Sequence, residues 1–279
     1  MGKMLATLSL LLALAVLAPQ AVRAEETTPT PAPAAPAAQT APTPEAAPTL
    51  AQRLDQADKL FEQRNQTGND RKSLDILLAL EKEDPNNFEV IWRVARGAYW
   101  VGEQAVDRGD LKTAEKFGDL GYKAGLKATQ LKPGRVEGYY WAAAALGQYS
   151  KGIGLWKAFW KGISGKYTDL CDKAIKIDKK HNMAGPLRTI GRYWYSLPDI
   201  KRDLKKSLTH LQEAVSLFPQ KLRNQAYLAD TLLDDGQKDK AVAHYQLCAA
   251  GDPGKEEVAD GLKWKAYCQK KLKDLSAGK

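Results

Sequence analysis

Hydrophobic residues recur along most of the chain at the spacing of a helix that is buried on one face. Leu204, Leu208, Leu211 and Val215, for example, follow one another at steps of three or four residues. Such steps place side chains on the same side of an α-helix. No run typical of a half-buried β-strand competes with this pattern, so the sequence predicts an all-α fold.

The predicted helices end in a recurring way. Five helical segments close on a proline, or on a lysine in the same place, and a polar turn follows each. Proline cannot continue a helix, so each of these positions ends one helical hairpin and opens the next. The five positions, at intervals of 48, 46, 40 and 34 residues, are Pro85, Pro133, Lys179, Pro219 and Pro253.

The last interval has the length and residue pattern of a tetratricopeptide repeat. Its first helix pairs a large with a small residue, and its second carries a small–aromatic–small stripe. The residues concerned are Leu228 and Ala229, then Ala241, Tyr245 and Cys248, with Asp235-Gly236 as the turn between the helices. We therefore expect a tetratricopeptide-like right-handed α-solenoid of about five helical hairpins, plus a capping helix from Glu256 to Leu275.

The first residues resemble an export signal. Lys3 precedes an apolar run from Leu5 to Ala18, and Val22-Arg23-Ala24 supplies small residues for a signal peptidase. Residues 25–48 consist almost entirely of Ala, Pro and Thr, which cannot bury enough apolar surface to fold. We expect a cleaved signal peptide at 1–24, a disordered linker at 25–48, a repeat domain at 49–279 and a periplasmic location.

The net charge and the cysteines bear on the class of partner and on disulfide pairing. The net charge of +9 falls to +7 once Lys3 and Arg23 are removed, which favours acidic ligands or anionic lipid as partners over nucleic acid. Three cysteines in an oxidising compartment leave at least one thiol unpaired within the chain. Counting helical rise from the turn near Gly251 puts Cys248 and Cys268 at different levels, so we expect them to stay unpaired.

Aromatic residues concentrate in the middle of the chain, where the intervals are longer than a simple repeat. Six of the seven tryptophans lie between residues 87 and 195, and the excess length of the second interval falls near 150–164. There Trp156, Phe159, Trp160 and Ile163 are spaced to share one helical face. Three interpretations stay open: an ordinary packing helix, which we favour, the wall of an apolar pocket, or a contact with a membrane.

Two strings in this region carry a specific resemblance: GYYWAAAALGQYSKG at 138–152 and AGPLRTIGRYWYSLP at 184–198. Together with the helix that ends on Pro219, they resemble the T-component family of TRAP transporters, within the tetratricopeptide superfamily. The regulator-of-microtubule-dynamics proteins share the same pattern. The resemblance covers roughly 70–275 and implies a periplasmic helical protein that partners a TRAP-type solute receptor. It leaves open a homo-oligomer and an apolar cavity.

The candidate site is the aromatic centre. We expect ligand or partner contacts from Tyr140, Trp141, Trp156, Trp160, Arg188, Tyr193 and Trp194. Arg188 could hold a carboxylate or stack and pair internally, and the internal role is favoured.

Enzymatic constellations are missing from the sequence. The three histidines show no metal-ligand spacing, and neither a phosphate-cradling loop nor a nucleophile elbow is present. We therefore expect no catalysis, no cofactor and no metal. Nucleic acid is not expected as a partner, and membrane contact is the least favoured of the three interpretations of residues 150–164. An accessory protein of solute uptake that binds a receptor and an apolar or acidic solute is the first hypothesis. A generic envelope scaffold that binds a protein or peptide in its concave groove is the alternative.

Overall fold

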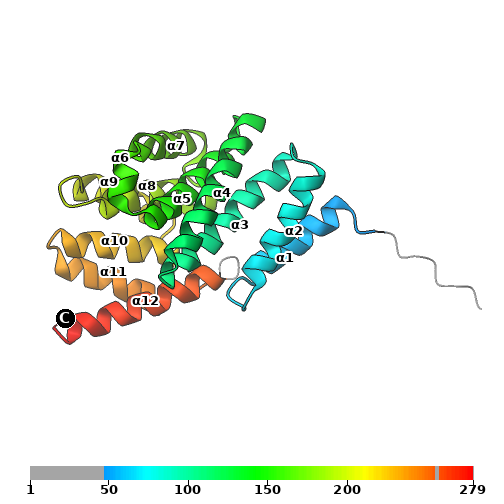
Figure 1. Cartoon of the computed structure of the whole chain (residues 1–279). Helices are drawn as coiled ribbons and strands as arrows, with labels where there is room; N and C mark the ends of the chain where they lie inside the picture. The colour runs from blue at the N-terminus through cyan, green and yellow to red at the C-terminus, as the bar shows by residue number, and fades with distance from the viewer. Residues whose placement is uncertain (1–46, 255–257, 279) are drawn as a thin grey trace, which may run out of the picture. The chain divides into compact units, whose positions relative to one another are not determined.

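The computed structural model describes residues 47–254 and 258–278. The expected signal peptide at 1–24 and nearly all of the expected linker at 25–48 lie outside the described residues. Within the described part, helices are the only regular elements (Figure 1). They are α1 (Leu50–Glu62), α2 (Asn69–Glu83), α3 (Phe88–Asp107), α4 (Leu111–Leu131), α5 (Val136–Ile153), α6 (Leu155–Trp160), α7 (Ile163–Asp178), α8 (His181–Ser196), α9 (Leu204–Leu217), α10 (Leu222–Asp234), α11 (Lys238–Ala250) and α12 (Val258–Ser276).

Successive helices pair as hairpins in the predicted order. The pairs are α1 with α2, α3 with α4, α5 with α7, α8 with α9, and α10 with α11, and α12 packs on the last pair. The second helix of each hairpin ends one or two residues before the predicted stop, or three before Pro253. The predicted all-α solenoid of five hairpins with a C-terminal cap is therefore confirmed.

Local chemistry fixes several helix starts. Thr49 begins α1 with a capping box, in which its hydroxyl accepts from the Gln52 backbone and the Gln52 side chain accepts in return. Asn87 and Asp110 cap α3 and α4 in the same manner, through side-chain oxygens. These contacts satisfy backbone N–H groups that have no partner inside the helix.

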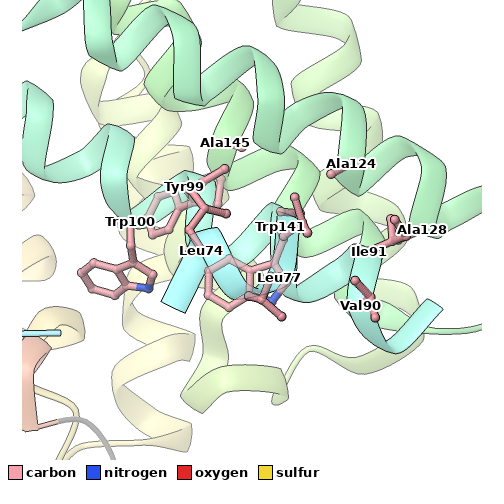
Figure 2. Close-up of a cluster of buried hydrophobic side chains, with 14 of the residues drawn as sticks. Leu74, Leu77, Val90, Ile91, Tyr99, Trp100, Ala124, Ala128, Trp141 and Ala145 are labelled. Carbon is pink, nitrogen blue, oxygen red and sulfur yellow. The ribbon is translucent and has the colours of Figure 1, made fainter. Parts of the chain in front are cut away.

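The main hydrophobic core lies between the first three hairpins. Figure 2 shows Trp141 of α5 among Leu74 and Leu77 of α2 and Tyr99 of α3. Trp141 is buried, and its ring centroid lies 5.6 Å from that of Tyr99. The expectation that Trp141 contacts a ligand therefore gives way to a core role.

Glycines allow α4 and α5 to pack with their backbones in near contact. A Cβ added at Gly125 would lie 2.7 Å from the Ala142 backbone, and one at Gly118 would lie 2.3 Å from Tyr149 N. Only a residue without Cβ fits at such a distance. This close approach fixes how α5 presents its other face to α7 and α8.

The expected apolar stripe in the second long interval is broken into two helices. Gly154 and Gly162 adopt φ values of +87° and +64° and bracket the short helix α6. Because the chain turns at Gly162, Ile163 starts α7 and is buried, whereas Trp156 and Trp160 stay on α6. The four residues therefore do not share one helical face.

The first turn of α8 is left-handed. Asn182, Met183 and Ala184 have φ values of 48°, 51° and 61°, which non-glycine residues rarely adopt. Regular α8 geometry begins at Gly185, where a Cβ would lie 2.7 Å from the Tyr140 ring. This turn brings the α8 backbone against α5.

Cys248 and Cys268 form a disulfide between α11 and α12, with a Cα–Cα distance of 6.1 Å. The expectation that they stay unpaired was wrong, because the count of helical rise started at Gly251. The chain makes no helix there, and α12 begins at Val258 and overhangs the end of α11. The overhang lets Asp260 reach Lys221 before α10, and it brings Cys268 level with Cys248. Cys171 is a buried free thiol.

No helix in residues 47–254 or 258–278 is both long and apolar enough to cross a membrane.

Candidate functional site

A concave pocket opens between α5, α7, α8 and α10. Tyr99 of α3 also lines it. The empty space in the pocket and its open mouth is about 960 Å³. Tyrosines from five helices line it, among small, polar and basic residues. These tyrosines are Tyr99, Tyr140, Tyr167, Tyr193 and Tyr227.

The aromatic wall is held by ring contacts and by hydroxyl hydrogen bonds. Tyr167 and Tyr193 stack with ring centroids 4.6 Å apart and an interplanar angle of 19°. The Tyr193 hydroxyl bonds that of Ser164, and the Tyr167 hydroxyl donates to the Thr189 carbonyl at 3.4 Å. Burial raises the pKa of both tyrosines, so both hydroxyl groups stay protonated and uncharged at neutral pH.

Four basic side chains also line the pocket: Lys151, Arg188, Arg192 and Arg223. Two of them are ion-paired. Arg223 donates to Glu103 at 2.7 and 2.9 Å and lies 2.9 Å from Asp260, while Arg192 donates to Asp230 at 2.7 Å.

Arg188 is buried and has only neutral partners among the described residues. It donates to the Asn182 and Met183 carbonyls at 3.3 and 3.0 Å, and to Asn224 Oδ1 at 2.9 Å. The same guanidinium lies 3.4 Å from the Tyr140 hydroxyl. These contacts satisfy backbone carbonyls of the left-handed turn that opens α8, so Arg188 has the internal role. No ion pair compensates its positive charge among the described residues.

Lys151 differs from the three arginines. No hydrogen bond or ion pair joins its ammonium to another residue in the described part of the chain. The Lys151 side chain is exposed at the pocket, although many protein atoms lie around its charged end. Removal from bulk water lowers its pKa, Arg192 and Arg223 add to that effect, and Glu103 opposes it. A bound anion would relieve this cost.

Gln148 adds a neutral polar group on the same wall. It lies one helical turn before Lys151 on α5, and its side chain is 5% exposed. Its Oε1 has no hydrogen-bond partner among the described residues. A buried acceptor of this kind is costly unless something donates to it, so the wall offers a site for a ligand hydroxyl or amide.

The structure divides the seven residues expected at the site. Tyr140, Arg188 and Tyr193 line the pocket. Trp194 is half-buried beside Tyr193 at 5.1 Å but does not line it. Trp141 belongs to the core. Trp156 and Trp160 are exposed on α6, so the favoured interpretation as an ordinary packing helix does not hold for these two tryptophans, whereas Ala158 and Ile163 of the same segment are buried.

Sequence reasoning missed Lys151, although a signal was present. Tyr140, Ala144 and Lys151 are spaced four and seven residues apart on α5 and share one face of that helix. Arg223 and Tyr227 could not have been found in this way, because they come from a hairpin far along the chain.

Metal ligands do not gather in the described ranges: no group of three or more His, Cys, Asp or Glu side chains there could hold an ion.

The hairpin array and its central pocket define a tetratricopeptide-like helical-repeat protein. The family described as Regulator of microtubule dynamics protein 1-3 matches residues 53–202, more than half of the chain. The chain belongs to that family. The match begins and ends earlier along the chain than the region of resemblance at roughly 70–275. It does not confirm the resemblance to the TRAP T-components.

Two solved structures are similar to the chain, and the first of them supports the fold. A thermophilic TPR protein of Thermus thermophilus is 16% identical, with a TM-score of 0.57 over 78% of this chain and 98% of that one. The crystal structure of MamA is also similar, at 16% identity and a TM-score of 0.42, over 77% and 96% of the two chains. The first likeness supports the all-α solenoid, and at this identity it says nothing about ligands. No curated protein matches the chain.

Proposed function

We propose that the chain is an exported, non-catalytic binding protein of the bacterial envelope, whose central pocket takes a small organic acid with an apolar or aromatic body. The observation that carries this proposal is the lone ammonium of Lys151 in a pocket walled by tyrosines. Apolar walls with a few converging polar groups are typical of small-molecule sites.

The ligand's chemistry follows from the wall. A carboxylate or phosphate placed at Lys151 would also experience Arg188 and Arg192, because all three line the same space. The tyrosine rings would cover the apolar body, and Gln148 Oε1 could accept from a hydroxyl or amide of the ligand. Binding would therefore require both an anionic end and a hydrophobic part.

The finer proposal is an accessory role in a periplasmic TRAP-type uptake system, with a solute receptor as the protein partner. It is supported by the strings at 138–152 and 184–198 and by the expected export signal at 1–24. A gene for a TRAP-type receptor next to this one would support it. Recovery of the chain from the cytoplasm with its first 24 residues intact would argue against the export step.

An envelope scaffold is the second candidate, because a tetratricopeptide-like array is a common surface for protein partners. Native mass spectrometry of the protein, expressed from the full chain and purified from the periplasm without denaturation, separates the two. A retained small-molecule mass supports the pocket proposal, whereas a bare chain that co-purifies with another protein supports the scaffold.

Lys151→Met tests the pocket directly. We expect the variant to lose the retained mass, because it removes the unpaired cation and keeps the aliphatic stem. Lys112→Met, an exposed lysine on α4, is the matched control and should retain the ligand. Equal retention by both variants would sink the proposal.

The pH dependence supplies a second readout. The pKa of Lys151 is lowered from 10.5 by burial and by the neighbouring arginines. Anion binding needs the protonated form, so retention by the wild type should weaken as the pH rises, beginning below 10.5. Lys151→Met should lack this dependence.

A further inference from the structure

We propose that α6 and the turns around it form a docking surface for an anionic lipid bilayer. The surface consists of Trp156, Trp160, Lys157 and Lys161, with Lys166 at the start of α7. This inference stands apart from the proposed pocket ligand, since either could hold without the other.

The first observation is exposure of the largest apolar side chains. Trp156 is 61% exposed and Trp160 is 81% exposed, although every other tryptophan in the described part of the chain is buried or half-buried. The two residues lie four apart on α6 and so share one face. Ala158, by contrast, is buried against the pocket and marks the inner face of the same helix.

The second observation is that the backbone sets α6 apart. Gly154 and Gly162, both in the left-handed region, end α5 and precede α7. The short helix α6 is therefore a separate element that lies beside α5 and α7 (Figure 1). Trp156 and Trp160 lie on its outer face and are exposed.

Charge decides which partner fits. Residues 150–168 contain four lysines and no aspartate or glutamate. Lys161 donates to the Tyr149 hydroxyl at 3.0 Å, and the nearest acidic groups that act on it are Glu115 and Asp119 of α4. Asp119 is already paired with Lys123 at 2.6 Å. Tryptophans flanked by lysines match a headgroup layer that carries negative charge, since indole rings prefer the interface and ammonium groups pair with anionic lipids.

The proposed docking surface and the pocket share the helix α6. Ala158 of α6 and Ile163 of α7 line the pocket, and so does Pro198, which follows α8. Ile200, two residues after Pro198, is 82% exposed. Because α6 carries both Ala158 of the pocket lining and the two exposed tryptophans, docking through α6 would bring the pocket close to the lipid surface.

Co-sedimentation with vesicles tests the proposal. Residues 47–279 form one compact unit that holds the whole described core, so this segment is used. We expect it to sediment with vesicles of mixed phosphatidylcholine and phosphatidylglycerol, and to stay in solution with phosphatidylcholine alone. Added NaCl should release it, because the attraction between lysines and headgroups is screened by salt.

Two pairs of variants give the matched controls. Trp156→Ala with Trp160→Ala should lower the bound-to-free ratio by about tenfold or more, whereas Leu247→Ala, which removes an exposed apolar residue of α11, should not. Lys157→Glu with Lys166→Glu should have a similar effect, and Lys270→Glu with Lys273→Glu, which changes the net charge equally on α12, should have little. The substituted side chains are exposed, so the helical circular dichroism spectrum should not change.

Two outcomes would overturn the inference. One is sedimentation that is absent, or equal for the wild type and both α6 variants. The other is a concentration-dependent dimer, seen by analytical ultracentrifugation without vesicles, that the tryptophan variants abolish, since a second copy would then cover α6. Loss of the pocket ligand in Lys151→Met with vesicle binding intact would leave this inference standing, because the two sites are tested by separate variants.

Discussion

At the scale of single residues, the position of the pocket depends on two glycines, which have no side chain to keep α4 and α5 apart. Gly125 and Gly118 of α4 face the α5 backbone at distances that leave no room for a Cβ. Because α5 carries Tyr140, Gln148 and Lys151, any shift of α5 away from α4 moves one whole wall of the site.

Gly125→Ala tests this close approach. The added methyl would lie 2.7 Å from Ala142, so we expect a loss of about 1–3 kcal/mol in the free energy of unfolding. Gly165→Ala is the control. Gly165 lies inside α7 with nothing within 4 Å, so alanine there should stabilise by about 0.5–1 kcal/mol through helix propensity. Urea denaturation measures both, and a neutral Gly125→Ala would show that the two helices can separate at little cost.

At the scale of helices, the hairpin boundaries could be read from the sequence and the contacts between hairpins could not. Prolines after α2, α4 and α9 mark helix ends because proline chemistry is local. The Cys248–Cys268 pairing depends instead on where α12 starts after a loop, and helical rise gives no information about a loop.

The same limit applies to the site. Tyr140 and Arg188 were found because aromatic and basic residues cluster in the two family-like strings. Whether a tryptophan on a predicted helix is core, wall or surface depends on which helix covers it, and that is a tertiary property. Trp141 and Trp156 both lie in helical segments that contain further aromatic residues, yet the first is buried and the second is exposed.

Removal of the disulfide is a prediction at the helix scale. The bond closes a loop with a sequence separation of 20 residues, so its loss should cost about 3 kcal/mol. Cys268→Ser should lower the midpoint of thermal unfolding. Reductant should lower the wild type in the same way and leave the variant unchanged. A wild type that is insensitive to reductant would mean that the two sulfurs are not bonded in solution.

At the scale of the whole repeat domain, an ionic cluster joins helices from distant hairpins. Arg223 of α10 bonds Glu103 of α3 and pairs with Asp260 of α12, and Lys221 pairs with Asp260 at 2.9 Å. Burial alone would raise the pKa of Glu103 and of Asp260, but Arg223 overcomes it and lowers both. Both carboxylates are therefore charged at neutral pH, and the cluster is fully ionised.

Arg223→Met should destabilise the domain by about 3–5 kcal/mol, because it leaves buried carboxylates with less compensation. Arg202→Met removes a pair with Asp234 nearer to solvent and should cost under about 1 kcal/mol. Chemical denaturation compares them. In the wild type the contribution should hold above the ordinary carboxyl pKa values of 4.5 and 3.8 and fade as the pH falls below them. Equal losses in the two variants would contradict a special role for the cluster.

The contact between α3 and α10 also restricts how this repeat array could grow or shrink. In an ordinary array each repeat touches only its neighbours, so repeats can be duplicated or lost one at a time. Here Glu103 and Arg223 are 120 residues apart, and Lys263 and Asp107 are 156 apart. An inserted or deleted hairpin between α4 and α10 would separate these partners. The number of hairpins is thus set by closure of the domain, and chains of this architecture should vary in their loops and in α6 rather than in repeat number.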